Sequence, residues 1–421
     1  MTQEPNIFPY IARLLQGAEV VWKPLGEIAS MYGGLTGKNK TDFEEGNASY
    51  ITYKNIFDNI EVDFDKLEKV KISPSEKQNK VRYGDVLFTG SSETAEDAGM
   101  SSAITTTIEE DIYLNSFSFG IRFNEDVKLI PEFSKYLFRS HFMRAAISKT
   151  ASGVTRFNIS KERLKKLSIP LPPLSVQQEI VRILDKFTQL EAELEAELDC
   201  RKRQYEYYRN KLLTFSEIGG GTEIVWKTLG EVGTFIRGNG LQKKDLITSG
   251  VPAIHYGQIY TYYGISAEQT ISFVSPETAE GLRKVDYGDV IITNTSENID
   301  DVGKAVAYCV KEQGVTGGHA TIFKPSEKII GKYLVYYTQT TEFSNQKRKY
   351  AKGTKVIDIS ANDLTKITIP LPPLSEQQRI ANILDKFDTL VNSISEGLPK
   401  EIALRRKQYE YYREKLLSFP S

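Results

Sequence analysis

The chain repeats itself, and the length of the repeated unit is the feature that most limits its fold. Sequence blocks of the first half return in the same order in the second half. The blocks are VVWKPLGEIAS (20–30) and IVWKTLGEVGT (224–234), RYGDVLFT (82–89) and DYGDVIIT (286–293), GVTRFNIS (153–160) and GTKVIDIS (353–360), IPLPPLSVQQEIVRILDKF (169–187) and IPLPPLSEQQRIANILDKF (369–387), and RKRQYEYYRNKLLTF (201–215) and RRKQYEYYREKLLSF (405–419). A unit of about 200 residues is too long for one layer of a solenoid, so we expect each copy to be a domain with an appended segment.

The two copies are alike in some segments and unlike in others. The blocks with helical character are nearly identical, whereas residues 31–80, 90–150, 235–285 and 294–350 have diverged almost completely. This pattern indicates one framework that carries two different binding surfaces.

The composition is that of a water-soluble protein with more than one domain. The 421 residues are 40% hydrophobic and 26% charged, no run approaches the ~18 apolar residues of a membrane span, and the first residues do not resemble a signal peptide, so we expect a cytoplasmic protein. Cys200 and Cys309 occupy unrelated places in the repeat, so we expect buried, reduced thiols and neither a disulfide nor a zinc site.

Each PPLS segment marks the start of a long helix. We expect Ser175 and Ser375 to be N-caps, because a serine followed three residues later by glutamine, here Gln178 and Gln378, forms a capping box. In the first copy mostly apolar residues then recur four and three positions apart, which is the seam of a coiled coil. This seam is Ile180, Leu184, Phe187, Glu191, Leu194, Leu198, Arg201, Tyr205, Tyr208 and Leu212.

A helix over 175–213 would be about 58 Å long at 1.5 Å per residue and would act as a spacer. In the second copy Gly397 and Pro399 should break the helix, because proline removes a backbone hydrogen bond, so we predict helices at 376–396 and 400–417. The two copies should pack antiparallel, each satisfying the seam of the other. The alternative is that these segments are ordinary core helices of one larger domain.

Short β-rich runs between turn signals predict the structure of the rest of the chain. Examples are VLFTG and SFSFGIRF in the first copy and DVIIT and ATIFKP in the second, and helices near 131–149 and 331–349 complete each copy. We therefore predict two pseudo-repeated α/β (α+β) domains, 1–174 and 217–374, joined by long antiparallel coiled-coil helical regions at 175–216 and 375–421.

We find no motif of a catalytic or cofactor site. GGLTGK at 33–38 is too short for a phosphate-binding loop, and neither an S-adenosylmethionine loop, an Asn/Asp-Pro-Pro-Tyr motif nor a nuclease carboxylate cluster is recognisable. His141, His255 and His319 are scattered and unpaired in the repeat, which disfavours triads and metal sites. We expect no catalytic residue, cofactor or metal in this chain. The formal net charge of −1 shows no overall basic excess. If the chain binds DNA, the positive charge that contacts the phosphates must be concentrated locally or come largely from partners.

The chain resembles the specificity subunits of Type I restriction-modification systems over essentially all of its length. The resemblance rests on the tandem VWK-x-LGE segments, the YGDV strands, the two IPLPPLS-x-QQ-x-I-x-x-ILDKF segments and the twin QYEYYR-x-KLL ends. It implies two target recognition domains, each reading one half of a split DNA sequence, separated by an antiparallel coiled coil. It also implies that two modification subunits dock on the helices and that restriction subunits join them, so S-adenosylmethionine, ATP and magnesium belong to those partners.

On this interpretation the diverged loops enter the major groove of double-stranded DNA and basic residues hold phosphates, while the partner methyltransferase flips an adenine from each half-site. For any single lysine or serine among the residues expected to bind DNA, a role on the solvated surface fits the sequence as well as a DNA contact does. The expected DNA-binding residues are Tyr32, Lys38, Lys40, Tyr53, Lys54, Ser91, Ser92, Thr155 and Arg156 in the first copy and Arg237, Asn239, Lys243, Lys244, His255, Tyr256, Gln258, Asn294, Ser296, His319, Thr354 and Lys355 in the second.

Basic and aromatic residues of the twin tyrosine segments lie off the seam. They could form a nucleic-acid patch or a partner-docking surface, and we assign them to partner docking. They are Arg203, Tyr207, Arg209, Lys407, Tyr411 and Arg413. Two other classes of function stay open. A scaffold would join partners without reading DNA and would lack salt-sensitive binding to duplex DNA, and an enzyme with a divergent methyltransferase site would bind S-adenosylmethionine on its own.

Overall fold

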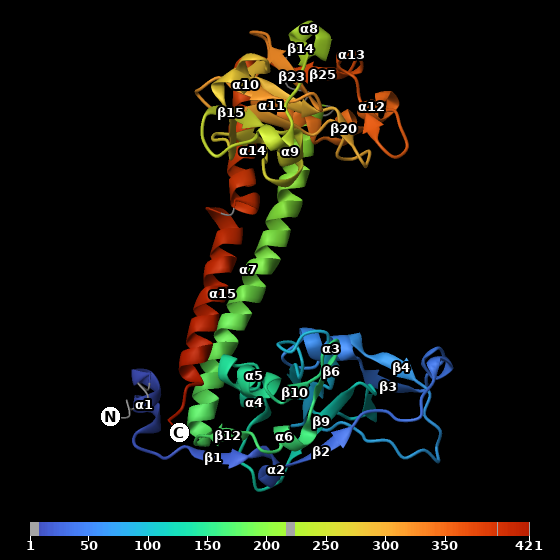
Figure 1. Cartoon of the computed structure of the whole chain (residues 1–421), viewed down its shortest axis with the longest axis vertical. Coiled ribbons are helices and arrows are strands. Elements are labelled where there is room, and N and C mark those ends of the chain that lie inside the picture. Colours follow the sequence, from blue (N-terminus) through green and yellow to red (C-terminus); the bar gives the residue numbers. More distant parts are fainter. Residues whose placement is uncertain (1–7, 216–223, 394, 421) are drawn as a thin grey trace. The chain divides into compact units, whose positions relative to one another are not determined.

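A computed structural model describes residues 8–215, 224–393 and 395–420. The chain divides into two compact units, Met1–Glu193 with Ile402–Ser421 and Leu194–Glu401. Each unit contains one globular domain and parts of the long helices (Figure 1). We call these globular parts the first and the second domain. The predicted boundary between residues 216 and 217 lies outside the described residues, and the predicted domain limits stay a prediction.

The first domain is built around one antiparallel sheet. The order of its strands is β2 (Ala29–Gly33), β9 (Ser118–Phe123), β5 (Val86–Thr89) and β7 (Ser101–Ala103). A second sheet has the order β4 (Glu68–Val70), β3 (Ala48–Ile51) and β8 (Ile112–Leu114). Two small sheets are β10 (Ala151–Ser152), β11 (Phe157–Ile159) and β6 (Ser91–Ser92), and β1 (Val21–Pro24) with β12 (Ser168–Leu171). The helices are α1 (Pro9–Leu15), α2 (Leu25–Ile28), α3 (Tyr53–Asp58), α4 (Pro131–Leu137), α5 (His141–Ser148) and α6 (Lys161–Leu164), and the 3₁₀ turns are η1 (Lys40–Phe43) and η2 (Phe64–Lys66).

The second domain repeats this plan with a wider central sheet. The order of its strands is β14 (Gly233–Arg237), β23 (Ala320–Pro325), β19 (Val290–Thr293), β21 (Ala305–Tyr308) and β16 (Ser266–Ala267). A second sheet has the order β17 (Ser272–Val274), β15 (Val251–Ile254), β22 (Gly314–Thr316) and β18 (Arg283–Val285). Two strand pairs are β20 (Thr295–Ser296) with β24 (Ile357–Asp358), and β13 (Val225–Thr228) with β25 (Thr368–Leu371). The helices are α8 (Leu229–Val232), α9 (Tyr256–Thr261), α10 (Pro276–Glu280), α11 (Gly331–Thr338), α12 (Thr341–Tyr350) and α13 (Ala361–Leu364), and the 3₁₀ turn is η3 (Lys243–Asp245).

The YGDV segments form the turns that lead into the central strands β5 and β19. In the first domain the side chain of Asp85 accepts the backbone N–H of Arg82 at 2.8 Å, and Asp289 accepts that of Asp286 at 2.8 Å in the second. All four residues of each following strand are buried, as expected for a central strand with both faces covered.

The helices predicted near 131–149 and 331–349 are each divided in two. In the first domain α4 ends before Ser140, whose hydroxyl donates to the carbonyl oxygen of Leu137 at 2.7 Å, and α5 follows. In the second domain Thr340 makes the same bond to Tyr337 at 2.8 Å and also accepts the N–H of Phe343 at 3.2 Å as N-cap of α12. A side-chain hydroxyl that bonds to the backbone competes with helical hydrogen bonds, which accounts for both breaks.

The long helices are α7 (Leu174–Thr214), α14 (Leu374–Asn392) and α15 (Gly397–Leu416). The first spans 41 residues. The predicted interruption between the other two is confirmed, but its bounds were wrong, because α14 ends at Asn392 and not at 396, and α15 begins at Gly397 and not at 400. Pro399 lies in the first turn of α15, where a missing N–H costs little. The predicted N-caps are wrong, because the caps lie two residues before the serines: Pro373 is the N-cap of α14, and Gln177 donates its backbone N–H to the carbonyl oxygen of Pro173 at 3.1 Å.

Within each unit the long helices run antiparallel. In the first unit the ring of Phe187 in α7 stacks on Tyr412 in α15 with centroids 5.4 Å apart, and Glu191 forms an ion pair with Arg406. In the second unit Phe387 of α14 stacks on Tyr205 and Tyr208 of α7 at 6.3 and 5.6 Å. The predicted seam is therefore the packed face of these helices. Their ends also belong to the domain cores, since Ile180 and Leu184 are fully buried there.

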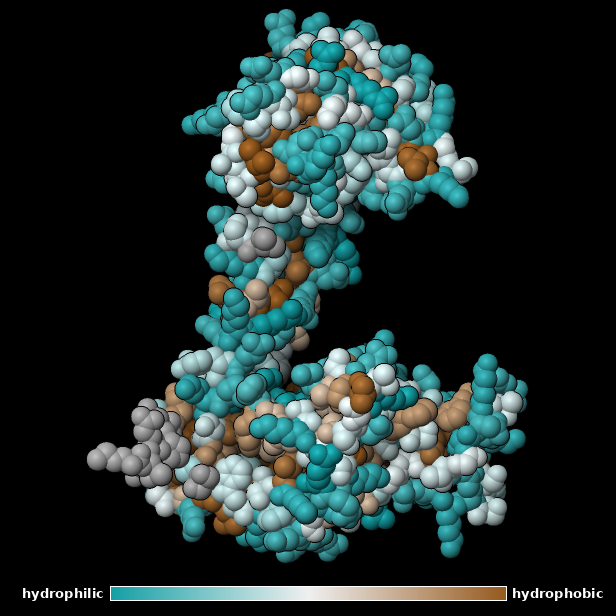
Figure 2. Space-filling view, in the orientation of Figure 1, coloured by the Kyte–Doolittle hydropathy of each residue, from teal (hydrophilic) through white to brown (hydrophobic). Residues whose placement is uncertain are grey.

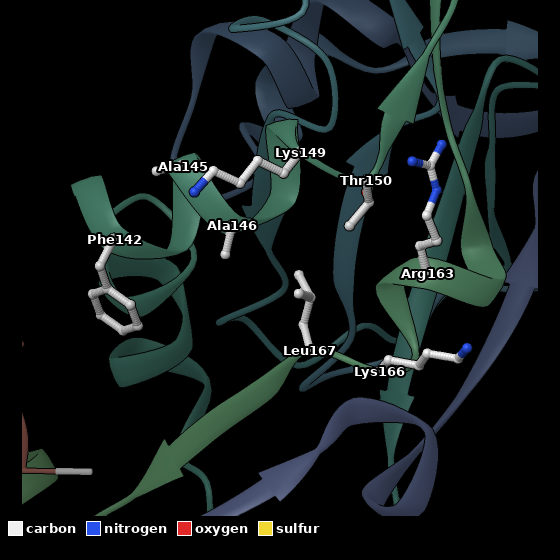
Figure 3. A pocket seen from close by; sticks show the side chains of 8 residues that line it. All are labelled: Phe142, Ala145, Ala146, Lys149, Thr150, Arg163, Lys166 and Leu167. Carbon is white, nitrogen blue, oxygen red and sulfur yellow. The ribbon is translucent and has the colours of Figure 1, made fainter.

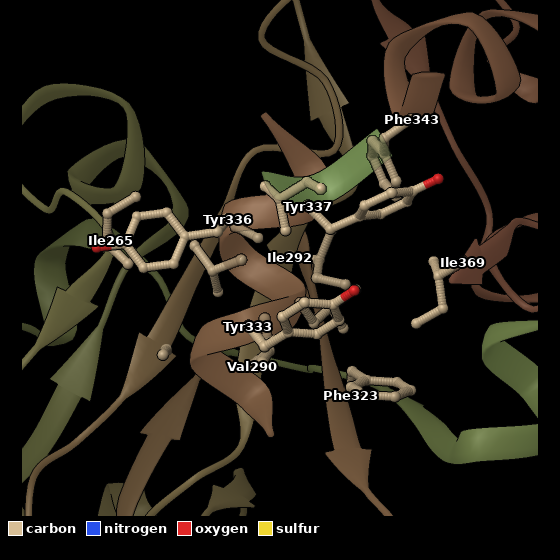
Figure 4. Packing of buried hydrophobic residues seen from close by; sticks show 14 of the residues in the cluster. Ile265, Val290, Ile292, Phe323, Tyr333, Tyr336, Tyr337, Phe343 and Ile369 are labelled. Carbon is tan, nitrogen blue, oxygen red and sulfur yellow. The ribbon is translucent and has the colours of Figure 1, made fainter. Parts of the chain in front are cut away.

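The core of the second domain lies between its central sheet and α11. Figure 4 shows the tyrosine side chains of this helix spreading into the core, with Tyr336 directed toward Ile265 and Tyr337 toward Phe343. Each of these side chains is fully buried or nearly so. The visible surface of the domains is mostly hydrophilic, with hydrophobic residues in isolated spots (Figure 2). Burial of the apolar face of a helix against a sheet is the usual source of stability for such a layer.

Two further expectations concern single features. Among the described residues no helix is long and apolar enough to cross a membrane. The expectation of two buried thiols is wrong for Cys200, which is exposed on α7, whereas Cys309 is half-buried. Cys200 lies on the solvent side of a narrow helical seam, where no neighbouring element covers it.

Candidate nucleic-acid interface

In each domain a short strand after the central strand pairs with the strand after a glycine turn. In the first domain Ser91 and Ser92 of β6 pair with Asn158 and Phe157 of β11. In the second, Thr295 and Ser296 of β20 pair with Asp358 and Ile357 of β24. This pairing joins a diverged segment of each copy to a repeated block at equivalent places.

In the first domain this place gathers four side chains. The Tyr53 hydroxyl donates to the carbonyl oxygen of Ser91 at 2.8 Å, and Arg156 Nε donates to the Ser91 hydroxyl at 3.0 Å. The Arg156 guanidinium lies 5.8 Å from the ring centroid of Phe117, which is 61% exposed. We call Tyr53, Ser91, Phe117 and Arg156 the first loop cluster. The structure thus brings three predicted DNA-binding residues together and adds Phe117.

The equivalent place in the second domain holds a different set of side chains on the same support. The Tyr260 hydroxyl donates to the carbonyl oxygen of Thr295 at 2.7 Å, and the Thr295 hydroxyl is hydrogen-bonded with His319 Nδ1 at 3.1 Å. The ring of Tyr256 lies 4.8 Å from His319 and 4.5 Å from His255, measured between centroids. We call these five residues the second loop cluster. It joins two histidines that lie far apart in the sequence.

His255 is held in its neutral form by its surroundings. It is the N-cap of α9, and its Nδ1 accepts the backbone N–H of Gly257 at 3.2 Å, which requires that nitrogen to carry no proton. Burial lowers the pKa of His255, and the nearby His319 and Lys243 lower it further. The neutral ring keeps its proton on Nε2, which is therefore its hydrogen-bond donor.

Two exposed turns precede β11 and β24. Gly153 and Gly353 have φ angles of 150° and 119°, and a Cβ at either position would come within 2.0 Å of a carbonyl oxygen. Glycine is therefore required at the start of each turn. The predicted residues Thr155, Arg156, Thr354 and Lys355 all lie exposed in these turns.

Two predicted DNA-binding residues of the first domain have partners within the fold. The Tyr32 hydroxyl donates to Asp85 at 2.6 Å, the Arg122 guanidinium lies 4.9 Å from the centre of its ring, and burial raises the Tyr32 pKa. Lys38 pairs with Glu76 at 2.6 Å, and its side chain is only 7% exposed. Both side chains are therefore engaged in contacts within the domain.

Three predicted amide side chains in the second domain are also bound internally. Asn239 donates to the carbonyl oxygen of Gly281 at 2.8 Å and accepts the N–H of Arg283 at 2.9 Å. Gln258 accepts the N–H of His255 at 2.9 Å and donates to the Ser272 hydroxyl at 2.5 Å. Asn294 is buried and accepts the Thr321 hydroxyl at 2.7 Å. Local sequence carries no signal of such distant partners.

The remaining predicted DNA-binding residues lie at or near the surface. Arg237 donates to the carbonyl oxygen of Gly318, next to His319, at 3.2 Å. Ser92 and Ser296 are half-buried in β6 and β20. The exposed lysines are Lys40, Lys54, Lys243 and Lys244.

The twin tyrosine segments present the same surface on α7 and α15. Tyr207 meets Tyr208 edge to face at 5.2 Å, and Tyr411 meets Tyr412 at 5.4 Å. A lysine lies over the outer ring of each pair, Lys211 at 5.6 Å from Tyr207 and Lys415 at 5.8 Å from Tyr411. All four rings are exposed.

The other predicted docking residues differ in their contacts. Arg203 forms an ion pair with Asp199 at 3.0 Å, and Lys407 is exposed. Arg209 donates to Gln339 at 3.0 Å, so it joins α7 to the second domain. Arg413 pairs with its neighbour Glu414 at 3.0 Å and is half-buried. The exposed tyrosine pairs and Lys407 are the parts of this set that a partner can reach.

A buried glutamine fixes each domain on its long helix. Gln177 donates to the carbonyl oxygens of Lys128 and Pro172, both at 2.8 Å, and accepts the N–H of Ile130 at 3.0 Å. Gln377 makes the equivalent three bonds in the second domain at 3.0, 2.8 and 2.9 Å. The sequence pattern directed attention to the neighbouring Gln178, whose side chain is exposed.

Comparison with known proteins assigns this arrangement. The family model "Type I restriction modification DNA specificity domain" matches residues 18–199 and 223–404. The chain belongs to this family. It is 32% identical to the EcoR124I/EcoR124II specificity subunit of Escherichia coli, over 98% of this chain and 97% of that protein. A putative type I specificity subunit of Haemophilus influenzae is 31% identical, over 97% of this chain and 98% of that protein.

A solved structure of a type I R-M system contains a chain of the same fold. Its TM-score is 0.63 at 20% identity, with 95% of this chain and 98% of that chain covered. The predicted fold class, two pseudo-repeated domains with long antiparallel helices, is confirmed. Among the described residues of this chain, no group of three His, Cys, Asp or Glu side chains could hold a metal ion.

Sequence reasoning missed three members of the loop clusters. Phe117 precedes β9 and is recognised as a candidate contact residue by its exposure in the structure. Sequence alone does not distinguish it from the buried Phe119. Tyr260 and Thr295 make the same kind of hydrogen bond as Tyr53 and Ser91. Thr295 lies at the position of Ser91 in the repeat and could have been found by comparing the ends of β5 and β19. The repeat does not point to Tyr260, because the first residue of α3, Tyr53, matches the first residue of α9, Tyr256.

Proposed function

We propose that the chain reads a bipartite DNA target, with one half-site for each domain. The observation that carries this proposal is the pair of loop clusters, which occupy equivalent places on equivalent strands but consist of different side chains. A subunit that reads two different half-sites needs this combination of a repeated support and two unlike reading surfaces. A scaffold that only joined partners would not need it.

The chemistry of the clusters suits base edges and phosphates. Arg156 offers a planar fork of donors, which fits guanine in the major groove, while Phe117 offers an apolar contact to a thymine methyl group. In the second domain His255 and His319 offer ring nitrogens to base edges. Lys355, Lys243 and Lys244 can hold phosphates, which fix the register but carry no sequence information.

The same proposal extends to partners. The twin tyrosine surfaces on α7 and α15 suit two copies of one partner, and we assign them to two adenine methyltransferase subunits, with restriction subunits joining that complex. The chain would be the non-catalytic subunit of a cytoplasmic enzyme. S-adenosylmethionine, ATP and magnesium would then be bound by the partners, and the methyltransferases would flip the adenines out of the duplex.

The test is methylation mapping of DNA from cells that express the chain with a cognate modification subunit. A split motif that appears only with the chain is expected. Replacing residues 25–167 by the same segment of a relative keeps β1 and β12 and should change one half of the motif, and replacing 229–367 should change only the other half. If a folded complex produces no motif that depends on the chain, DNA reading is excluded and the scaffold is favoured.

Single-residue variants sharpen the test. Arg156→Ala should relax the first half-site, at a cost of roughly 1–3 kcal/mol in discrimination, without altering the second. Lys244→Ala should weaken binding to all sequences and reduce the salt dependence of binding by about one phosphate contact. An Arg156→Ala enzyme with an unchanged motif would remove this residue from the reading surface.

A further inference from the structure

A hollow of about 510 Å³ opens on the surface of the first domain, between α5 and the segment that joins α6 to β12 (Figure 3). Its floor is apolar and half-buried, formed by Phe142, Ala146 and Leu167 among others. Figure 3 shows Ala146 and Leu167 facing one another across it. Three exposed cations, Lys149, Arg163 and Lys166, line it as well. Its size lies in the ~300–1,000 Å³ range of ligand sites.

The second domain fills the equivalent place with its own side chains. Where the first domain has Ala146, the second has Gln346, which accepts the N–H of Thr368 and donates to its carbonyl oxygen, both at 2.9 Å. Where the first domain has Thr150, the second has Tyr350, whose ring centroid lies 5.5 Å from Lys366 Nζ. The hollow is thus a consequence of two smaller residues in the first domain.

The charges differ in the same way. Lys366 of the second domain forms an ion pair with Asp363 at 2.7 Å. The equivalent positions in the first domain are Lys166 and Arg163, so a carboxylate is replaced by a second cation. Among the described residues no ion pair joins a carboxylate to Lys149, Arg163 or Lys166, and the nearby Glu162 pairs with Lys165 at 2.9 Å. The first domain therefore lacks both the aromatic ring and the carboxylate that complete this place in the second.

We propose that the hollow docks an acidic segment of a partner protein through one aromatic side chain. The aromatic ring would lie on Phe142, Ala146 and Leu167, in the place of Tyr350, and flanking carboxylates would pair with the three cations, in the place of Asp363. A DNA backbone carries the right charge but would leave the apolar floor uncovered. The site exists in one copy only, so this partner would bind the first domain and not the second.

The test uses the full chain and a fluorescein-labelled synthetic peptide with one tyrosine flanked on each side by two aspartates. Saturable binding with a Kd below about 1 mM is expected in fluorescence anisotropy. Lys149→Glu with Lys166→Glu should weaken it about tenfold or more. Lys349→Glu, at the equivalent helix position beside the filled place of the second domain, is the matched control and should leave it unchanged.

Two further variants separate shape from charge. Ala146→Gln with Thr150→Tyr copies the second domain and should abolish peptide binding, with circular dichroism to verify the fold. Replacing the peptide tyrosine by alanine should weaken binding about tenfold. The proposal is overturned if the peptide does not bind, or if Lys349→Glu has the same effect as the double charge reversal. It is also overturned if the double charge reversal weakens the binding of duplex DNA and not that of the peptide, since the hollow would then be a phosphate site. None of these outcomes depends on which bases the chain reads.

Discussion

Replacing Gln177 by leucine tests how the first domain is fixed on its long helix. The side chain is fully buried, and its loss leaves the carbonyl oxygens of Lys128 and Pro172 and the N–H of Ile130 without their partner. A buried polar group without a partner costs at least about 1 kcal/mol, and this applies in full to the bond with Pro172, whereas the bonds with Lys128 and Ile130 are part-buried. The total loss should therefore be roughly 1–3 kcal/mol. For a unit of this size that loss corresponds to a fall in Tm of roughly 2–12 °C.

The assay is scanning calorimetry of the full chain, with hydrogen exchange to locate the effect. Gln178→Leu is the matched control, because Gln178 is the adjacent residue and is exposed, so its replacement should change stability by no more than about 0.5 kcal/mol. Amide exchange should rise at Ile130 and α4 in the Gln177→Leu variant only. Equal melting of the two variants would refute the reasoning, because it would mean that water or a shifted backbone replaces all three bonds.

Three further predictions concern single residues. Burial lowers the pKa of His255 below its usual 6.5, so the unfolded chain binds more protons over this range and the free energy of unfolding should fall as the pH falls from about 7 through 6.5. His255→Asn, which can still cap α9, should flatten this dependence in denaturant titrations, and an unchanged dependence would contradict the assignment. Gly397→Ala should lower Tm more than Gly37→Ala. Both glycines have φ near 70°, but only at Gly397 would a Cβ approach a carbonyl oxygen, that of Thr389, at 2.4 Å. Equal falls in Tm would assign the whole effect to the backbone angle φ. Tyr53→Phe and Tyr260→Phe should each cost about 1 kcal/mol and raise amide exchange in β6 and β20 respectively, and no change in either strand would contradict the assigned hydrogen bonds.

The parts of the fold that sequence predicts well are those written in local periodicity. The seam of α7 follows from apolar residues four and three positions apart, and the break before α15 follows from Gly397. The repeat adds that the helices of the two copies pair. The exact start of each helix was not predictable from the capping pattern, because Pro173 and Pro373 lie two residues before the serines and fix the backbone there.

The candidate site is less predictable, because each side chain is recruited or excluded by a partner far away in the sequence. Lys38 looks like a loop cation until Glu76 is placed beside it, and Asn294 looks like a base reader until Thr321 is placed beside it. The same distance hides the meeting of His255 and His319 on the ring of Tyr256, which depends on how β15 and β23 are ordered in their sheets. Composition of the loops carries none of this information.

The hydrogen bonds of the loop clusters divide support from reading. Tyr53 and Tyr260 each bond to a backbone carbonyl oxygen, at Ser91 and Thr295, and that bond is independent of the side chain at the position. The side-chain hydroxyls of Ser91 and Thr295 hold the side chains that face outward. Ser91 holds Arg156 in the first domain, and Thr295 holds His319 in the second. A substitution at the outward-facing residue therefore changes the donors and acceptors offered to a ligand without removing the bond that positions the loop. The two copies can diverge in what they bind while keeping the same support, which is why nearly identical helices can carry clusters as different as arginine with phenylalanine and paired histidines.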